Sequence, residues 1–166
     1  MRLIKNQSRY TLVSLLEPVD EGYTFLKGNW PPHITIAGPL ITELNQNQLT
    51  KIMTELANHR HGFNATIIQE GYLGTLNNPV PEILVDMDSG LRKLHADTVD
   101  ALIAKGSMFT ESSRTGENYV AHINRVRKNL HLHEGDYIEI NNLTLIDMSD
   151  IDGSQRKIIK VLKFPK

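Results

Sequence analysis

The stretch PPHITIAGPL, Pro31 to Leu40, decides the fold because it places a histidine and a threonine two residues apart inside an apolar, β-branched run. A short run of this kind is typical of a buried strand. Side chains alternate across a strand, so His33 and Thr35 share one face while the two isoleucines share the other. We therefore expect the polar pair to face a cavity and the isoleucines to face a core.

A second stretch repeats the pattern about ninety residues further along the chain. YVAHINRVRK, which begins at Tyr119, contains His122 and Asn124 with Ile123 between them. The same alternation puts His122 and Asn124 on one face, with an amide in place of the hydroxyl. Each predicted strand thus offers one titratable ring beside one uncharged hydrogen-bonding group.

The rest of the sequence predicts an α+β chain. Helical spacing of apolar residues predicts a helix over 43–59, with Thr42 as a possible N-cap, and a second helix that begins at 88–90 and ends before Gly106. The segments 73–82 and 107–119 are rich in turn-forming residues and are expected to be connections. Apolar and β-branched runs predict strands at 10–16, 33–37, 63–70, 83–87, 119–126, 136–148 with a bulge at 141–142, and 156–164.

This order of elements is not the regular strand–helix alternation of a doubly wound fold, and no phosphate-binding glycine motif is found. With 166 residues, 40% of them hydrophobic and 22% charged, the whole chain, 1–166, is expected to form one globular domain. The net charge of -1 provides no general positive field, so a long nucleic-acid duplex is not expected as a partner.

The chain contains no cysteine, which excludes disulfides, thiolate nucleophiles and cysteine-bound zinc. This composition fits a reducing interior, so a cytoplasmic location is expected. Residues 1–18 lack the pattern of a signal peptide. No apolar run approaches the roughly 20 residues that span a bilayer, so no membrane helix is expected.

Two histidines beside neutral hydrogen-bonding groups suit in-line displacement at a phosphodiester. One group must take a proton from the attacking oxygen while another protonates the leaving oxygen, and imidazole serves both roles near neutral pH. The Thr35 hydroxyl and the Asn124 amide could donate hydrogen bonds to the non-bridging phosphoryl oxygens. This scheme needs neither a metal nor another cofactor.

The two stretches resemble the paired HxT/S signatures of the 2H phosphoesterase superfamily, which includes bacterial 2'-5' RNA ligase-like proteins and cyclic nucleotide phosphodiesterases. The resemblance implies a bilobal fold, in which two pseudo-symmetric antiparallel β-sheet lobes with flanking helices place both histidines in a central cleft. It further implies that His33 and His122 are the catalytic acid and base and that Thr35 binds phosphate. Arg127 matches the spacing of an arginine that follows the second motif in many members, and Arg125 is its competitor.

The sequence departs from the superfamily pattern at Asn124, where threonine or serine is usual. An asparagine side chain is longer and carries a carbonyl oxygen that would repel a phosphoryl oxygen if it faced the cleft. This difference motivates an alternative function, in which the chain is a nucleotide- or RNA-end-binding module that keeps the cleft and has lost turnover.

Three other patterns in the sequence fit both a functional and a purely structural interpretation. His59 with His61, and His131 with His133, have the spacing of metal ligands, although a helix end and an exposed turn explain them equally well. The segment 111–118 has the composition of a lid, with Ser112, Ser113 and Arg114 near substrate, but also that of a solvated connection. Four aromatic residues could stack on a nucleobase or simply border the core: Tyr10, Trp30, Tyr72 and Tyr119.

The sequence therefore predicts an enzyme that hydrolyses or ligates phosphodiester bonds by metal-independent acid–base catalysis. The expected substrate is a 2',3'-cyclic or 2'-5' phosphodiester of a small RNA or nucleotide. The protein is expected to act as a monomer, with no membrane partner.

Overall fold

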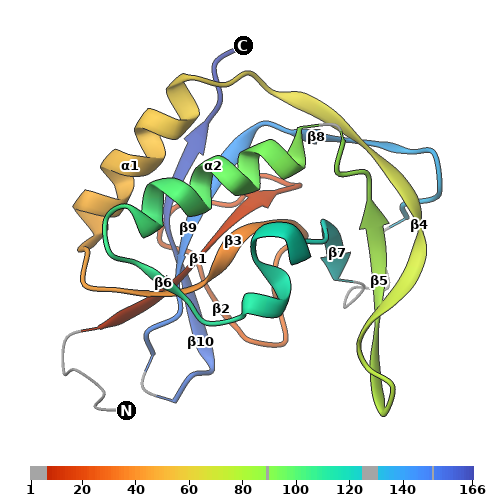
Figure 1. Cartoon of the computed structure of the whole chain (residues 1–166), viewed down its shortest axis with the longest axis horizontal. Helices are drawn as coiled ribbons and strands as arrows, with labels where there is room; N and C mark the ends of the chain where they lie inside the picture. Colours follow the sequence, from red (N-terminus) through yellow and green to blue (C-terminus); the bar gives the residue numbers. More distant parts are fainter. Residues whose placement is uncertain (1–6, 89, 125–130, 151) are drawn as a thin grey trace.

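The computed structural model describes residues 7–88, 90–124, 131–150 and 152–166 (Figure 1). Within these residues the chain forms an antiparallel sheet with two α-helices, so the predicted α+β class is confirmed. The helices are α1 (Gln46–Asn58) and α2 (Leu91–Ile103), and two short 3-10 turns follow them, η1 (Ser112–Arg114) and η2 (Gly116–Asn118). The strands are β1 (Ser8–Leu15), β2 (Thr24–Leu26), β3 (His33–Thr42), β4 (Phe63–Thr75), β5 (Asn78–Val85), β6 (Met108–Phe109), β7 (His122–Asn124), β8 (Tyr137–Ile140), β9 (Asn142–Asp147) and β10 (Gln155–Lys163).

The order of strands across the sheet is β2-β10-β9-β1-β3-β7-β5-β4-β8, and β6 pairs with β3 beside this path. Strands β3 and β7 therefore join two halves of the sheet, one built on β1 and β9 and the other on β4 and β5. Helix α1 contacts β9 and β10, while α2 contacts α1 and β3. In Figure 1 the two helices lie beside one another over this first half of the sheet.

The core lies between the sheet and the helices. Ile34, Ile36 and Ile123 are fully buried, as the alternation of the two histidine strands predicts. Each helix adds one apolar face, as expected from its 3.6-residue period. The buried residues of the helices include Leu49, Met53 and Ala57 from α1, and Leu91, Leu94, Val99 and Leu102 from α2.

Helix α1 begins later than predicted, so the expectation that Thr42 is its N-cap is wrong. Asn45 is the N-cap, and a capping box forms because its side chain accepts from the Gln48 N–H while the Gln48 side chain accepts from the Asn45 N–H. Thr42 is instead the last residue of β3, where its hydroxyl oxygen accepts hydrogen bonds from Leu44 N–H and the Ser107 hydroxyl.

Most of the segment 73–82 is strand and not the predicted connection. β4 and β5 form a long hairpin in which Tyr72 pairs with Pro81 and Thr75 with Asn78. Turn-forming composition misled the prediction because Pro79 and Pro81 usually interrupt a sheet. Here β7 pairs with 82–84 of β5, so among the described residues both prolines have a partner strand on one side only.

Two other differences concern the ends of elements. The predicted strand 136–148 is divided at Asn141 into β8, which pairs with β4, and β9, which pairs with β1 and β10. The helix-start residues 88–90 give an N-cap at Gly90, whose positive φ of 112° suits glycine. Ser89 lies outside the described residues. Neither α-helix has the length and apolar composition that crossing a bilayer demands.

Gly38 allows β1 and β3 to approach closely beside the predicted polar pair. Its φ is 147°, and a Cβ added there would meet the Thr11 backbone at 2.9 Å.

We expect Gly38→Ala to destabilise the protein by about 2 kcal/mol or more, because backbone strain and a backbone clash combine. The melting temperature should fall by about 4–8 °C. Gly28→Ala is the matched control, since a Cβ there meets nothing within 4 Å; equal melting temperatures would contradict this reading.

Candidate active site

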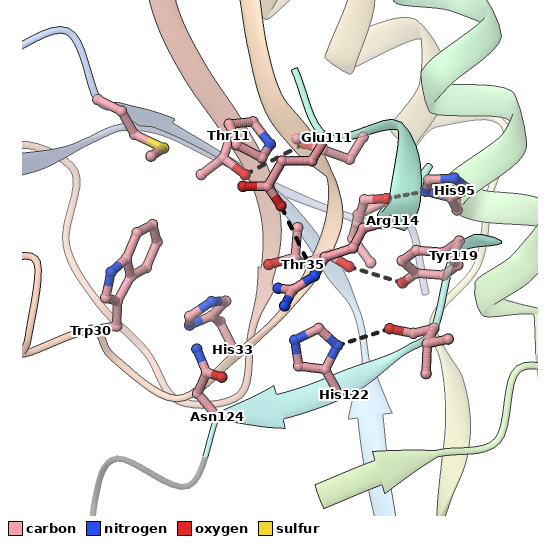
Figure 2. A pocket seen from close by; sticks show the side chains of 16 residues that line it. Thr11, Trp30, His33, Thr35, His95, Glu111, Arg114, Tyr119, His122 and Asn124 are labelled. Atoms are coloured by element: carbon pink, nitrogen blue, oxygen red, sulfur yellow. Dashed lines mark hydrogen bonds and ion pairs between the residues drawn. The ribbon is translucent and has the colours of Figure 1, made fainter. Parts of the chain in front are cut away.

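One pair of residues brings the two histidine strands together. β3 and β7 run antiparallel, and Ile34 is paired with Ile123. The antiparallel register therefore places His33 opposite Asn124 and Thr35 opposite His122. All four side chains lie on the face of the sheet opposite to the isoleucines. These four side chains line one solvent-open cavity of about 190 Å³ (Figure 2).

Each catalytic candidate is held by the carbonyl two residues before it. His33 Nδ1 lies 2.8 Å from Pro31 O, and His122 Nδ1 lies 2.8 Å from Val120 O. A carbonyl only accepts, so Nδ1 carries the proton in both rings and donates it. In the neutral tautomer this leaves Nε2 with its lone pair, and it is therefore the nitrogen available to exchange a proton.

Both imidazoles are neutral at pH 7. Burial lowers the pKa of His33 to about 4, with a smaller effect from His122, and only the hydrogen bond to Pro31 O opposes it. Burial also lowers the pKa of His122, and the positive charge of Arg114 adds to this effect while Val120 O opposes it. His33 is 7% exposed and His122 is half-buried, so His122 is the ring more accessible to solvent.

Trp30 forms the wall of the cavity next to His33. Its ring centroid lies 4.7 Å from that of His33, and the Phe25 ring packs against the indole in an edge geometry with a centroid distance of 5.0 Å. Figure 2 shows the indole at the side of the cavity away from His122. Of the other aromatic residues considered for stacking, Tyr10 lies in the core and Tyr72 on the exposed part of the β4–β5 hairpin.

Tyr119 and His95 fix the backbone beneath Thr35. The Tyr119 hydroxyl donates to Thr35 O at 2.8 Å, and the two aromatic rings stack at 3.9 Å with an angle of 2° between their planes. Gly116 N–H donates to His95 Nε2 at 2.9 Å, so Nδ1 carries the proton and donates to Ile36 O at 2.6 Å. Burial lowers the pKa of His95 and raises that of Tyr119, which keeps both side chains neutral. They are supports and not acid–base groups.

Arg114 is the cation that the structure places at this cavity. It lies in η1, with its Nε 4.0 Å from Glu111 Oε2, and about half of its side chain is exposed. Figure 2 shows its guanidinium above the two histidines. The sequence indicated Arg114 only as part of a possible lid over the substrate. Ser112 and Ser113 of the same segment do not line the cavity. Arg125 and Arg127 lie outside the described residues.

The histidine pairs considered as metal ligands are exposed. His59 is the C-cap of α1 and His61 follows it, while His131 and His133 lie before the turn that leads to β8. Among 7–88, 90–124, 131–150 and 152–166, no three histidine or carboxylate side chains are grouped as ligands of one ion.

The chain has the fold of solved LigT and phosphoesterase structures, which confirms the fold that the sequence resemblance implies. A solved structure of Escherichia coli LigT complexed with 3'-AMP is similar to the chain with a TM-score of 0.58 and 15% identity, over 96% of this chain and 99% of that one. LigT complexed with NADP+ gives a TM-score of 0.56 at 16% identity, with 98% and 100% covered. A phosphoesterase structure gives 0.56 at 16% identity, with 96% and 99% covered. No protein-family model matches the chain, nor does any curated protein sequence.

We predict that neither cleft histidine is charged at neutral pH. In a ¹H–¹⁵N NMR titration of the ligand-free protein, His33 should titrate near pH 4 and His122 below 6.5, because burial disfavours the imidazolium. Both rings should show the Nδ1–H tautomer above these values. A His33 ring that titrates at or above 6.5 would contradict this description of the cleft.

Proposed function

We propose that the protein cleaves or forms a phosphodiester bond of a small RNA or nucleotide by acid–base catalysis with His33 and His122. The observation that carries this proposal is the Ile34–Ile123 pair, which directs two imidazoles with the same tautomer into one cavity. A phosphorus centre between them would have one proton acceptor and one proton donor within reach, as in-line displacement demands.

In hydrolysis of a 2',3'-cyclic phosphate, His33 is the base. Its low pKa keeps Nε2 unprotonated, so it accepts the proton of the attacking water as the new P–O bond forms. His122 is the acid and gives its proton to the ribose oxygen as the old P–O bond breaks. The negative charge of the bound phosphate raises the pKa of both rings, which allows His122 to be charged in the complex. In the direction of ligation the two roles exchange.

Three side chains from different elements can stabilise the charge on the non-bridging oxygens. Thr35 from β3 and Asn124 from β7 offer neutral donors, and Arg114 from η1 offers a charge-assisted one. Arg127 keeps the phosphate-binding role that the sequence resemblance implies. No step of this mechanism passes through a metal ion.

The proposed substrate is a nucleotide or RNA end with a 2',3'-cyclic or 2'-5' phosphodiester. The likeness to LigT structures that hold 3'-AMP and NADP+ supports a nucleotide ligand. Trp30, which lines the cavity beside His33, offers an indole face to a base attached to the phosphate at the histidines. The small size of the cavity favours a single nucleotide or chain end over duplex.

We expect His33→Ala and His122→Ala each to lower kcat for a nucleoside 2',3'-cyclic phosphate by about 10²–10⁴-fold, the usual contribution of a positioned acid or base. Chromatography of the nucleoside monophosphate product provides the measurement. His61→Ala, which removes an exposed histidine outside the cavity, should leave kcat unchanged. Activity should persist after treatment with a chelator.

Two results would contradict this proposal. Loss of activity in chelator with recovery on adding zinc would favour a metal site. Binding of the cyclic nucleotide without cleavage by the wild type, together with cleavage by Asn124→Thr, would favour the alternative function as a binding module.

Arg114→Gln tests the phosphate-binding cation that the structure places at the cavity. Loss of a charge-assisted hydrogen bond of about 1.5–3 kcal/mol should lower kcat/KM by about 10–100-fold. The matched control is Arg92→Gln, which removes an exposed guanidinium from α2. Equal kcat/KM values for the two variants would exclude Arg114 from substrate binding.

A further inference from the structure

A carboxyl group that the proposed mechanism does not use lies directly behind the second motif. Glu82 is in β5 and only 3% exposed, although glutamate is rarely buried without a partner. The antiparallel register pairs Glu82 with Asn124 and Leu84 with His122. Paired residues point to the same face of a sheet, so Glu82 is on the cleft face, beside the asparagine that departs from the superfamily pattern.

The Asn124 amide and the Glu82 carboxyl group lie within hydrogen-bond distance, and with an ionised carboxylate the bonds form only when Nδ2 faces Glu82. Of the two terminal atoms of the Asn124 amide, the one that faces β5 lies 2.5 and 2.6 Å from the two carboxyl oxygens of Glu82. An amide has a donor end and an acceptor end, whereas an ionised carboxylate only accepts. The protonation state of Glu82 therefore decides which end of the amide faces β5 and which end is left for the cleft.

Two arrangements satisfy this contact. When Glu82 is ionised, Asn124 Nδ2 donates to the carboxylate, so the carbonyl Oδ1 is directed to the cleft and repels a phosphoryl oxygen. When Glu82 is protonated, its O–H donates to Oδ1, and Nδ2 is left to donate to the phosphoryl oxygen.

We propose that Glu82 is a positioning residue, whose protonated carboxyl turns the Asn124 amide so that Nδ2 can bind the phosphoryl group. This inference rests on the proposed function and assigns a role to the residue that distinguishes this chain from the superfamily pattern. A threonine hydroxyl at 124 would need no such partner, because it rotates to donate or accept. The asparagine does need one.

The charges around Glu82 are compatible with a protonated carboxyl at neutral pH. From β7 it faces Asn124 and His122, from β4 the register partner is Gly71, and His33 of β3 stands opposite Asn124. Both histidines are neutral at pH 7. Among the described residues, Arg114 is the cation that acts on Glu82 and lowers its pKa, but burial has the larger effect and raises the pKa to about 7. Glu82 thus changes its protonation within the physiological range.

Glu82→Gln tests the proposal, because a glutamine amide mimics the protonated carboxyl at every pH. We consider the ratio of kcat/KM for Glu82→Gln to kcat/KM for wild type. The pH dependence that comes from the two histidines is common to both proteins and cancels in this ratio. We expect a ratio near 1 at pH 6 that rises about tenfold by pH 8, where a group with a pKa of about 7 is about one-tenth protonated. In an Asn124→Thr background the same ratio should not change with pH.

Glu55→Gln is the matched control, since it makes the same chemical change on the exposed face of α1. Its ratio to wild type should stay near 1 throughout. A Glu82→Gln ratio that does not vary from pH 6 to 8 would overturn the proposal, as would the same rise in the Asn124→Thr background.

A second measurement does not depend on turnover or on the folding of a variant. In the ligand-free wild-type protein, nuclear Overhauser contacts between the Asn124 side-chain NH₂ and the His33 ring should be present below pH 6 and lost above pH 8. Contacts that are independent of pH would overturn the proposal. Absence of activity in every protein, with these contacts changing as expected, would instead refute the proposed function and leave the role of Glu82 in orienting Asn124 standing.

Discussion

The site depends on the pairing of Ile34 with Ile123 at the centre of the sheet. This pair joins β3 to β7 and thereby the two halves of the strand order. It buries both isoleucines completely, and the alternation of the strands then forces the polar neighbours of each isoleucine onto the opposite face. A shift of one residue in either strand would turn its histidine into the core. Packing of the core and placement of the site are thus one constraint.

Burial at this face sets the protonation states of the cleft. The same removal from water that lowers the pKa values of His33 and His122 raises that of Glu82, because in each case it disfavours the charged form. In the ligand-free cleft the two histidines are therefore neutral at pH 7 and Glu82 is partly protonated, while Arg114 supplies positive charge at the edge. In the proposed mechanism, a bound phosphodiester anion supplies the negative charge that raises the pKa values of the histidines, so substrate binding and protonation of the acid are coupled.

The sequence predicted the elements whose patterns are local. Alternation around His33 and His122 was sufficient to place four polar side chains on one face, and helical spacing located both helices. The extension of β5 through two prolines could not be predicted, because it depends on which neighbour each strand edge has in the sheet. The start of α1 was misplaced since Thr42 and Asn45 are both N-cap residues, and only the capping box with Gln48 decides between them.

Contacts between side chains of different strands and helices could not be predicted from the sequence either. Nothing in the composition of the segment 111–118 distinguishes Arg114 at the cavity from a solvated arginine. Glu82 looked like an ordinary polar residue in a turn, and its contact with Asn124 follows from the β5–β7 register alone. Tyr119 was visible as an aromatic residue next to the second motif, whereas its hydrogen bond to Thr35 O requires the two strands to be assembled.

A crystal structure of the protein with a ribonucleoside vanadate, which mimics the pentacoordinate phosphorus of in-line displacement, would show whether both histidines reach one phosphorus centre. We expect vanadate between the two imidazoles, with Nε2 of His33 and Nε2 of His122 each about 2.6–3.2 Å from a different apical oxygen. Vanadate bound elsewhere, or both rings in contact with the same oxygen, would contradict this expectation.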